Sequence, residues 1–250
     1  MLLVHGFGLS HRCWDDITPA LASTGFRTVA YDHRGHGRSS VGRDGVGLRQ
    51  LRDDLRSLLI ELDLDNVIIL SHSMGTFVAL DALDDPVTRS RVNHLVLVNP
   101  ITGDSGKGAP TARLQGPLVR HGIAQWLARG RRIGNAMARM SLGRNATADV
   151  VEATRRGLAG VRRSATPMID VLRKETVADV LTRIDTPTTI LVSASDKVTP
   201  AWHARLIVST MPSARLEYVP DVGHMTQWEA PRRVVEAVST AAGQRRERRC

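Results

Sequence analysis

The sequence predicts an α/β fold built on a mostly parallel sheet flanked by helices. Three observations support this prediction: short apolar runs recur along the chain, helical patterns separate them, and most of the runs are continuously apolar rather than alternating. A strand that is apolar on both faces is typical of a parallel sheet covered on both sides. Strand–helix–strand repetition is the pattern that builds such a sheet.

The predicted strands are the short apolar runs at residues 2–4, 28–31, 67–70, 95–98, 189–192 and 216–219. Helices are predicted between them where apolar side chains recur at three- and four-residue steps, at residues 47–62, 75–84, 200–210 and 228–241. No apolar run reaches the roughly 18 residues that a membrane span needs, so we expect no stable membrane insertion.

This alternation of strands and helices stops between residues 101 and 185. That stretch has helical periodicity, glycine and proline breaks and no convincing strand, and a Gly-rich hinge from Thr102 to Pro110 opens it. We therefore predict a helical cap at 101–185, inserted into a discontinuous core of residues 1–100 and 186–243. Residues 244–250 are predicted to form a basic, solvated tail.

The net charge of +9 is concentrated in this predicted cap: residues 101–185 carry +8 and the remaining residues +1. A nucleic-acid module is disfavoured, because no recognition motif is present and aromatic residues make up only 4%. Arg155-Arg156 and Arg162-Arg163, seven residues apart, would repeat on one helix face. That face could steer anionic substrates or touch an anionic membrane surface. Alternatively it is a solvated face in an arginine-rich chain, which we favour.

Ser73 is the candidate nucleophile. It follows the apolar run 67–70 in the segment Ser71-His-Ser-Met-Gly75, and an apolar helical pattern begins directly after it. Small residues two positions away on either side allow the strained turn that lifts a serine hydroxyl out of a sheet. The helix that follows directs the positive end of its dipole toward developing negative charge.

A nucleophilic serine needs a base, and the base needs an orienting acid. His224 follows the last predicted strand and Asp196 follows the one before it, so both are expected at the carboxyl edge of the sheet. Asp221 is an alternative acid, disfavoured because only three residues separate it from His224. His72 is disfavoured as the base, since adjacent side chains on a tight turn diverge.

The oxyanion site is predicted at the beginning of the chain. Leu2-Leu-Val-His-Gly-Phe-Gly8 is a strand that ends in a Gly-rich turn. In this arrangement the backbone N–H groups of Phe7 and Met74 can hold a tetrahedral oxyanion together. Trp126, Met137 and Met140 in the predicted cap either line an acyl pocket or only pack cap helices.

The chain resembles a cap-bearing, esterase- or lipase-like serine hydrolase of the α/β-hydrolase fold. The motifs occur in the family's order: His5-Gly-Phe-Gly8, Asp32-His-Arg-Gly-His-Gly-Arg-Ser39, Ser71-His-Ser-Met-Gly75, Ser193-Ala-Ser-Asp196 and Gly223-His224. The resemblance implies Ser73 as nucleophile, His224 as general base and acid, and Asp196 as the residue that orients it. The family usually has two further strands before the His-Gly turn, so the strand near Val29 is expected to form an open edge.

We therefore expect an enzyme that cleaves a carboxylic ester of a small or medium-size acyl substrate through an acyl-enzyme, without a metal or organic cofactor. A metal role for His33 and His36 is disfavoured because their spacing supplies too few ligands. Lactonase, thioesterase, carbon–carbon bond hydrolase and cofactor-free perhydrolase activities use the same triad, and a hydrolase-fold ligand receptor retains it. We expect a cytoplasmic monomer or homodimer, because two cysteines form no disulfide framework and no signal peptide is visible.

Overall fold

The computed structural model describes residues 1–23, 25–104 and 117–247. At its centre is a six-stranded sheet in the order β2-β1-β3-β4-β5-β6. Every neighbouring pair of strands is parallel, which confirms the predicted fold class. The strands are β1 (Leu2–Val4), β2 (Val29–Ala30), β3 (Val67–His72), β4 (Val92–Val98), β5 (Thr188–Ser193) and β6 (Ala214–Val219). Each predicted run overlaps one of them, and β2 occupies an edge of the sheet.

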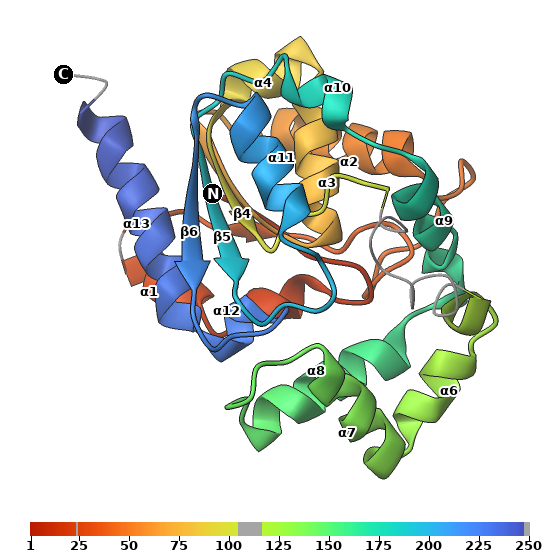
Figure 1. Ribbon diagram of the computed structural model, residues 1–250. Coiled ribbons are helices and arrows are strands. Elements are labelled where there is room, and N and C mark those ends of the chain that lie inside the picture. Colours follow the sequence, from red (N-terminus) through yellow and green to blue (C-terminus); the bar gives the residue numbers. More distant parts are fainter. Residues whose placement is uncertain (24, 105–116, 248–250) are drawn as a thin grey trace.

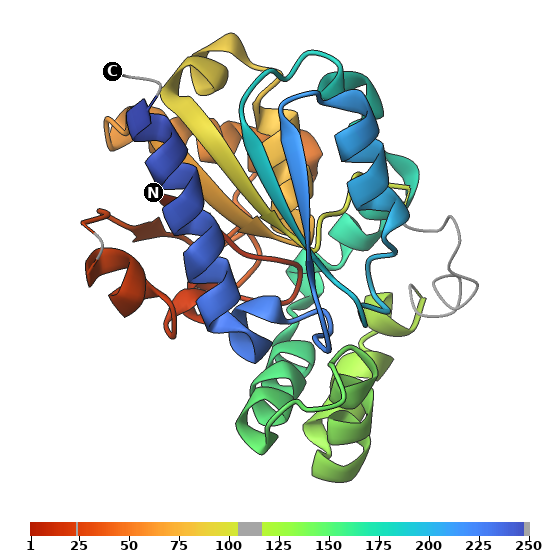
Figure 2. The same cartoon turned by 60° about the vertical axis from the view of Figure 1, so that its left-hand side comes forward.

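Helices cover both faces of the sheet (Figures 1 and 2). In β3, Val67 and Ile69 belong to one apolar cluster and Ile68 and Leu70 to another. Both faces of the strand are therefore buried, which explains its continuously apolar sequence. The first cluster includes residues of α2 (Leu48–Glu61), α3 (Met74–Ala82), α10 (Ala178–Leu181) and α11 (Trp202–Thr210). The second includes residues of η1 (His11–Trp14), α1 (Thr18–Ser23) and α13 (Pro231–Glu247).

Two short helices complete the sheet region: α4 (Pro86–Arg91) leads into β4, and α12 (Thr226–Glu229) precedes α13. The helix α13 runs through Glu247, so residues 244–247 of the predicted basic tail continue a helix instead of fraying. None of the helices in the described ranges is both long enough and apolar enough to cross a membrane.

The described residues between β4 and β5 are mostly helical, with α6 (Ile123–Arg129), α7 (Arg131–Met140), α8 (Ala148–Gly160), η2 (Arg163–Ala165) and α9 (Pro167–Lys174) before α10. Helices α6, α7 and α8 lie beyond the carboxyl ends of the strands (Figure 1). The helix α10 differs: its Val180 and Leu181 are buried in the first core cluster, together with Val177 just before it and Ile184 just after it. The predicted boundary at residue 185 therefore assigns to the cap a helix that packs on the sheet. In the predicted hinge, residues 105–110 lie outside the described residues.

Gly75 is a position where the fold tolerates no side chain. A Cβ atom there would lie 2.7 Å from the carbonyl oxygen of His5 and closer still to that of Val4, and neither backbone atom can move aside. We expect Gly75→Ala to lower the free energy of unfolding by about 1–3 kcal/mol or more, as overpacking does. Gly160→Ala is the matched control, because nothing lies within 4 Å of its added methyl group. Urea denaturation of both variants measures the difference; equal stabilities would contradict this packing.

Candidate active site

Ser73 occupies the sharp turn between β3 and α3. Its backbone has φ 50° and ψ −122°, a strained combination for a residue with a side chain. The turn is held by neighbouring backbone: the Ser73 N–H donates to Val98 O at 3.0 Å, and the Thr76 hydroxyl donates to Ser73 O at 2.6 Å. A Cβ atom on Gly6 would approach the Ser73 Cβ to 3.1 Å, so glycine leaves space beside the serine.

His224 lies between Ser73 and Asp196. Its Nε2 atom is 3.0 Å from Ser73 Oγ, and its Nδ1 atom is 2.8 Å from Asp196 Oδ2. The side chains of His224 and Asp196 are only 6% and 2% exposed, so bulk water competes little for these contacts. The structure thus brings the three predicted residues, which are distant in sequence, into one hydrogen-bonded line.

Asp196 is held by several donors at once. Its Oδ1 accepts from the backbone N–H of Val198 at 2.7 Å and of Thr199 at 3.1 Å, and the Thr199 hydroxyl donates to Oδ2 at 2.5 Å. Burial raises the pKa of Asp196, but the charge and hydrogen bond of His224 and the Thr199 donors outweigh it, so the pKa lies below its ordinary value. The alternative acid, Asp221, is exposed and makes none of the hydrogen bonds found at His224 in the described structure.

The predicted oxyanion residues occupy the turn after β1 and the first position of α3. Gly6 lies against Ser73 on one side, so the turn that contains Phe7 adjoins the serine. Within the described ranges, the backbone N–H groups of Phe7 and Met74 donate to no backbone acceptor. Two unengaged donors beside a serine hydroxyl are what an oxyanion site requires.

A family model described as the alpha/beta hydrolase family matches residues 1–237. The chain belongs to the alpha/beta hydrolase family. A hydrolase from Pseudomonas aeruginosa PA01 is 28% identical, with a TM-score of 0.74 over 97% of this chain and 89% of that one. An esterase from Exiguobacterium antarcticum shares the fold, with 20% identity and a TM-score of 0.83 over 96% of this chain and 91% of that one. A bromoperoxidase from Bacillus anthracis shares it too, with 22% identity and a TM-score of 0.84 over 97% of this chain and 91% of that one.

Further buried histidines lie near the candidate site of this alpha/beta hydrolase. His72 donates through Nε2–H to the His224 carbonyl at 2.8 Å, and His5 Nδ1 lies 2.8 Å from Gly6 O. Burial lowers the pKa of each ring to about 3, so both are neutral at physiological pH. The His33 backbone N–H donates to His5 Nε2 at 3.0 Å, a structural contact. No group of potential metal ligands occurs among the described residues.

These neutral histidines should make stability depend on pH. Below pH 6.5 the unfolded chain binds protons at His5 and His72, whereas the folded chain binds them only near pH 3. The free energy of unfolding should therefore fall on acidification by at most ~1.4 kcal/mol per pH unit for each histidine. His72→Gln keeps a donor for the His224 carbonyl. In urea denaturation at several pH values, it should reduce the slope of the free energy of unfolding against pH by the contribution of one histidine. His121→Gln, at an exposed residue, is the control; equal slopes in all three proteins would contradict the assignment.

Asn99 was not predicted, although it organises the His224 loop. It follows β4 with φ 46° and is buried. Its Nδ2 donates to His224 O at 2.9 Å and Thr226 Oγ1 at 2.8 Å, while its Oδ1 accepts from Ser193 N at 2.8 Å. One amide therefore ties β4 to β5 and to the loop that carries His224. A polar residue directly after a predicted strand is the only signal the sequence offers.

Glu229, also not predicted, joins the same loop to the helical insertion. Its carboxylate accepts from the backbone N–H of Gly223 at 3.1 Å and Met225 at 3.2 Å, and from Gly143 at 2.6 Å. The His224 N–H in turn donates to Ser141 O at 2.6 Å. The segment between α7 and α8 is therefore bonded directly to the loop of the candidate base.

The predicted arginine face does not form. Helix α8 ends at Gly160, before Arg162, so the two arginine pairs do not share a helix. Arg155 and Arg156 both pair with Glu152, at 2.7 and 2.8 Å. Arg162 instead donates to Gly37 O and Ser39 O at 3.3 and 3.2 Å. Both predicted alternatives, a substrate- or membrane-facing surface and a solvated face, assumed one shared helix face, and the end of α8 at Gly160 rules that face out.

None of the three apolar residues singled out in the predicted cap is buried. Trp126 is 68% and Met140 65% exposed, and Met137 is partly exposed. Interior packing of the cap helices instead uses small side chains such as Ala128 and Ala138, which are fully buried. The alternative in which Trp126 and Met140 only pack cap helices is therefore wrong for these two residues.

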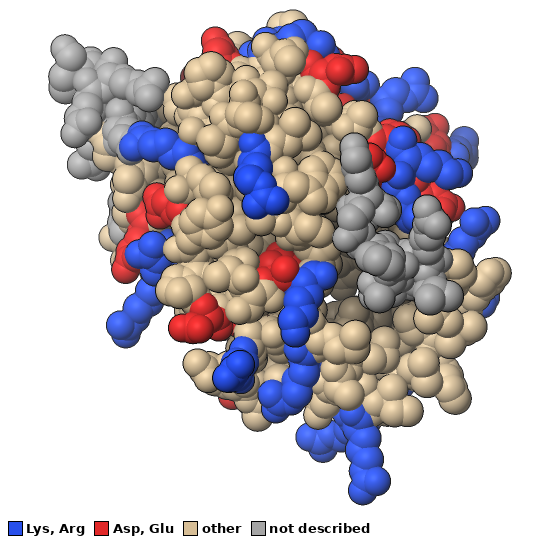
Figure 3. All heavy atoms as spheres, in the orientation of Figure 1, with Lys and Arg blue, Asp and Glu red and all other residues tan. Residues whose placement is uncertain are grey.

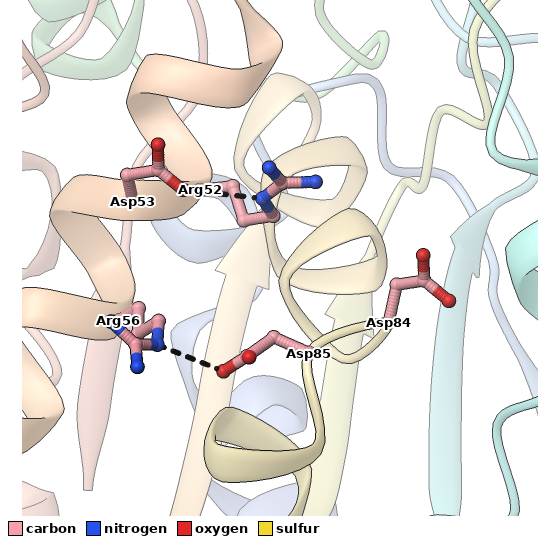
Figure 4. Close-up of a pocket in the computed structure, with 5 residues that line it drawn as sticks. All are labelled: Arg52, Asp53, Arg56, Asp84 and Asp85. Atoms are coloured by element: carbon pink, nitrogen blue, oxygen red, sulfur yellow. Dashed lines mark hydrogen bonds and ion pairs between the residues drawn. The ribbon is translucent and has the colours of Figure 1, made fainter.

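A separate surface pocket of about 370 Å³ lies between α2 and the region of α3 and α4 (Figure 4). It is lined by Arg52, Asp53, Arg56, Asp84 and Asp85. Its charges are paired, with Arg56 Nε 3.1 Å from Asp85 and Arg52 Nε 3.3 Å from Asp53. Because none of the three candidate catalytic residues lines it, this pocket is not the candidate active site.

Proposed function

We propose that the protein is a serine hydrolase that cleaves a carboxylic ester of a small or medium-size substrate through an acyl-enzyme. The observation that carries this proposal is the buried hydrogen-bonded line Ser73–His224–Asp196, with Ser73 on a strained turn. Membership of the alpha/beta hydrolase family supports a hydrolase. The three roles of a nucleophile, a base and an orienting acid are matched by residue type, distance and burial.

In the proposed first step, His224 Nε2 takes the proton of Ser73 Oγ, 3.0 Å away, as Oγ attacks the ester carbonyl carbon. The carbonyl electrons move to oxygen, and the backbone N–H groups of Phe7 and Met74 stabilise that oxyanion. Asp196, whose pKa is lowered, stays ionised and stabilises the imidazolium that forms. His224 then gives its proton to the departing alkoxide, which leaves as the alcohol.

The acyl-enzyme is hydrolysed by the same groups. Water, activated by His224, attacks the acyl carbon, the oxyanion forms again, and the proton returns to Ser73 Oγ as the acid departs. In this proposal α6, α7 and α8 are the cap that bounds the substrate site. Its support is the bond from His224 N to Ser141 O, which joins the cap to the catalytic loop.

Labelling with a fluorophosphonate probe tests the nucleophile. We expect stoichiometric modification of Ser73, identified by peptide mass spectrometry, and loss of labelling in Ser73→Ala. Ser71→Ala is the matched control, since Ser71 belongs to the same segment but its side chain is fully buried and makes no hydrogen bond in the described structure. Labelling that persists in Ser73→Ala would remove the proposal.

A substrate panel then separates the alternatives that share the triad. Esters, thioesters and lactones of increasing acyl length are compared with a β-diketone, which tests carbon–carbon bond hydrolysis. A hydrogen peroxide arm is included because a protein of the same fold is named a bromoperoxidase. Turnover of simple esters is expected to dominate. Labelling of Ser73 together with stoichiometric binding and negligible turnover of the whole panel would identify a ligand receptor instead.

A further inference from the structure

Five of the large hydrophobic side chains exposed in the described residues gather within a short segment, on and just before α6 and α7: Leu118, Ile123, Trp126, Ile133 and Met140. Trp126 and Met140 are the most exposed of them, at 68% and 65%. Single exposed apolar residues are ordinary on a protein surface, whereas several of them in one pair of helices are typical of an interaction site. Figure 1 places α6 and α7 at the lower end of the molecule, opposite α4 and α10.

Each of the two helices has one buried face and a second, exposed face that is apolar. In α7, Gly134 and Ala138 are buried, and Ile133 and Met140, seven residues apart, share a different face. At about 100° per residue that apolar face is turned roughly 100° or more from the buried one. In α6, Ile123 and Trp126 are likewise turned away from the buried Gln125 and Ala128. The apolar faces therefore point outward rather than into the packing between helices.

The same segment carries only positive charge. Residues 117–148 contain six arginines and neither aspartate nor glutamate. Arg120 pairs with Asp170 at 3.3 Å. The other five are exposed and make no ion pair among the described residues: Arg129, Arg131, Arg132, Arg139 and Arg144. In Figure 3 basic side chains project from the lower end of the molecule, and the visible surface over α6 and α7 shows no acidic side chain.

From this combination we propose that the α6–α7 surface is a peripheral binding site for an anionic phospholipid surface. An amphipathic helix with Trp and other apolar residues on one face and arginines beside them is the pattern that lies in a membrane interface. The unpaired arginines supply the charge complementarity, because anionic headgroups attract each exposed basic side chain. A second copy of this chain fits less well, since two such faces would bring unpaired arginines together. The site does not depend on the proposed hydrolase activity.

Vesicle co-sedimentation tests the proposal, using vesicles of phosphatidylcholine with and without phosphatidylglycerol at low and high salt. The protein should bind only the anionic vesicles, and high salt should weaken binding. The triple variant R129Q/R132Q/R139Q, at the exposed arginines that flank the apolar faces, should lose affinity on the order of a hundredfold, since each basic side chain contributes about fivefold. Trp126→Ser with Ile133→Ser should also lower affinity, through lost apolar burial.

The matched control is R43Q/R49Q/R205Q. It removes three exposed arginines that lie outside the helical insertion, and it should keep wild-type affinity. A loss as large in the control as in the α6–α7 variant would overturn the site, because binding would then follow net charge alone. Equal binding to both vesicle types, or to neither, would also overturn it. So would a dimer in sedimentation velocity that Trp126→Ser dissociates. Vesicle binding is also measured with Ser73→Ala. Its affinity should equal that of the wild type, so the membrane proposal and the hydrolase proposal are tested separately.

Discussion

Ser73→Ala is expected to lower kcat for ester hydrolysis on the order of 10⁶-fold, while the variant folds normally. The hydroxyl is the only group on the turn within hydrogen-bond distance of His224 Nε2, at 3.0 Å. Removing it leaves His224 with no proton to accept and the substrate with no attacking oxygen. The bonds from Ser73 N–H to Val98 O and from the Thr76 N–H and hydroxyl to Ser73 O do not involve the Ser73 side chain, so the turn should persist.

A double-mutant cycle tests whether Ser73 and His224 act together. If Ser73 and His224 act as one unit, S73A/H224A should be no less active than either single variant, because each change alone already abolishes the nucleophile. Steady-state kinetics on the best ester of the panel measures the cycle, and circular dichroism confirms folding. Additive losses in the double variant would mean that the two residues act separately and would contradict the proposed mechanism.

The sheet and the three candidate catalytic residues were predictable because their signals are local. A strand buried on both faces must be apolar at successive residues, as in Val67-Ile-Ile-Leu70, and a strained serine turn needs small neighbours. Chain order then places Asp196 and His224 after successive strands, at the same edge of a parallel sheet. Each of these inferences needs only the periodicity of one element and the direction of the strands.

The positioning groups were not predictable, because their roles depend on which loops meet in space. Asn99 and Glu229 look like ordinary polar residues, yet each binds several backbone groups of the His224 loop. The predicted shared arginine face is wrong for a related reason. The prediction requires one helix to continue from Arg155 to Arg162, but α8 ends at Gly160. A seven-residue repeat specifies one face only while the helix continues.

Asp196→Asn is expected to lower kcat by about 10⁴-fold, although it replaces one atom by another of similar size. The surroundings fix how the amide must lie. The backbone N–H groups of Val198 and Thr199 both donate to Oδ1, so the amide oxygen must occupy that position and the NH₂ group must replace Oδ2. That places an NH₂ donor 2.8 Å from His224 Nδ1, which must then accept and lose its proton. The proton is forced to Nε2, where His224 can no longer take one from Ser73.

Asp221→Asn distinguishes this orientation effect from a loss of negative charge near His224. Asp221 is exposed, belongs to the same loop as His224, and has φ 58°, a conformation that asparagine adopts readily. Its substitution should leave kcat within about twofold of wild type, in keeping with ordinary surface changes. Both variants remove one carboxylate, so comparing their kcat values isolates the contact to Nδ1. If Asp221→Asn were the more damaging change, the acid of the triad would be Asp221, and the assignment of Asp196 would be wrong.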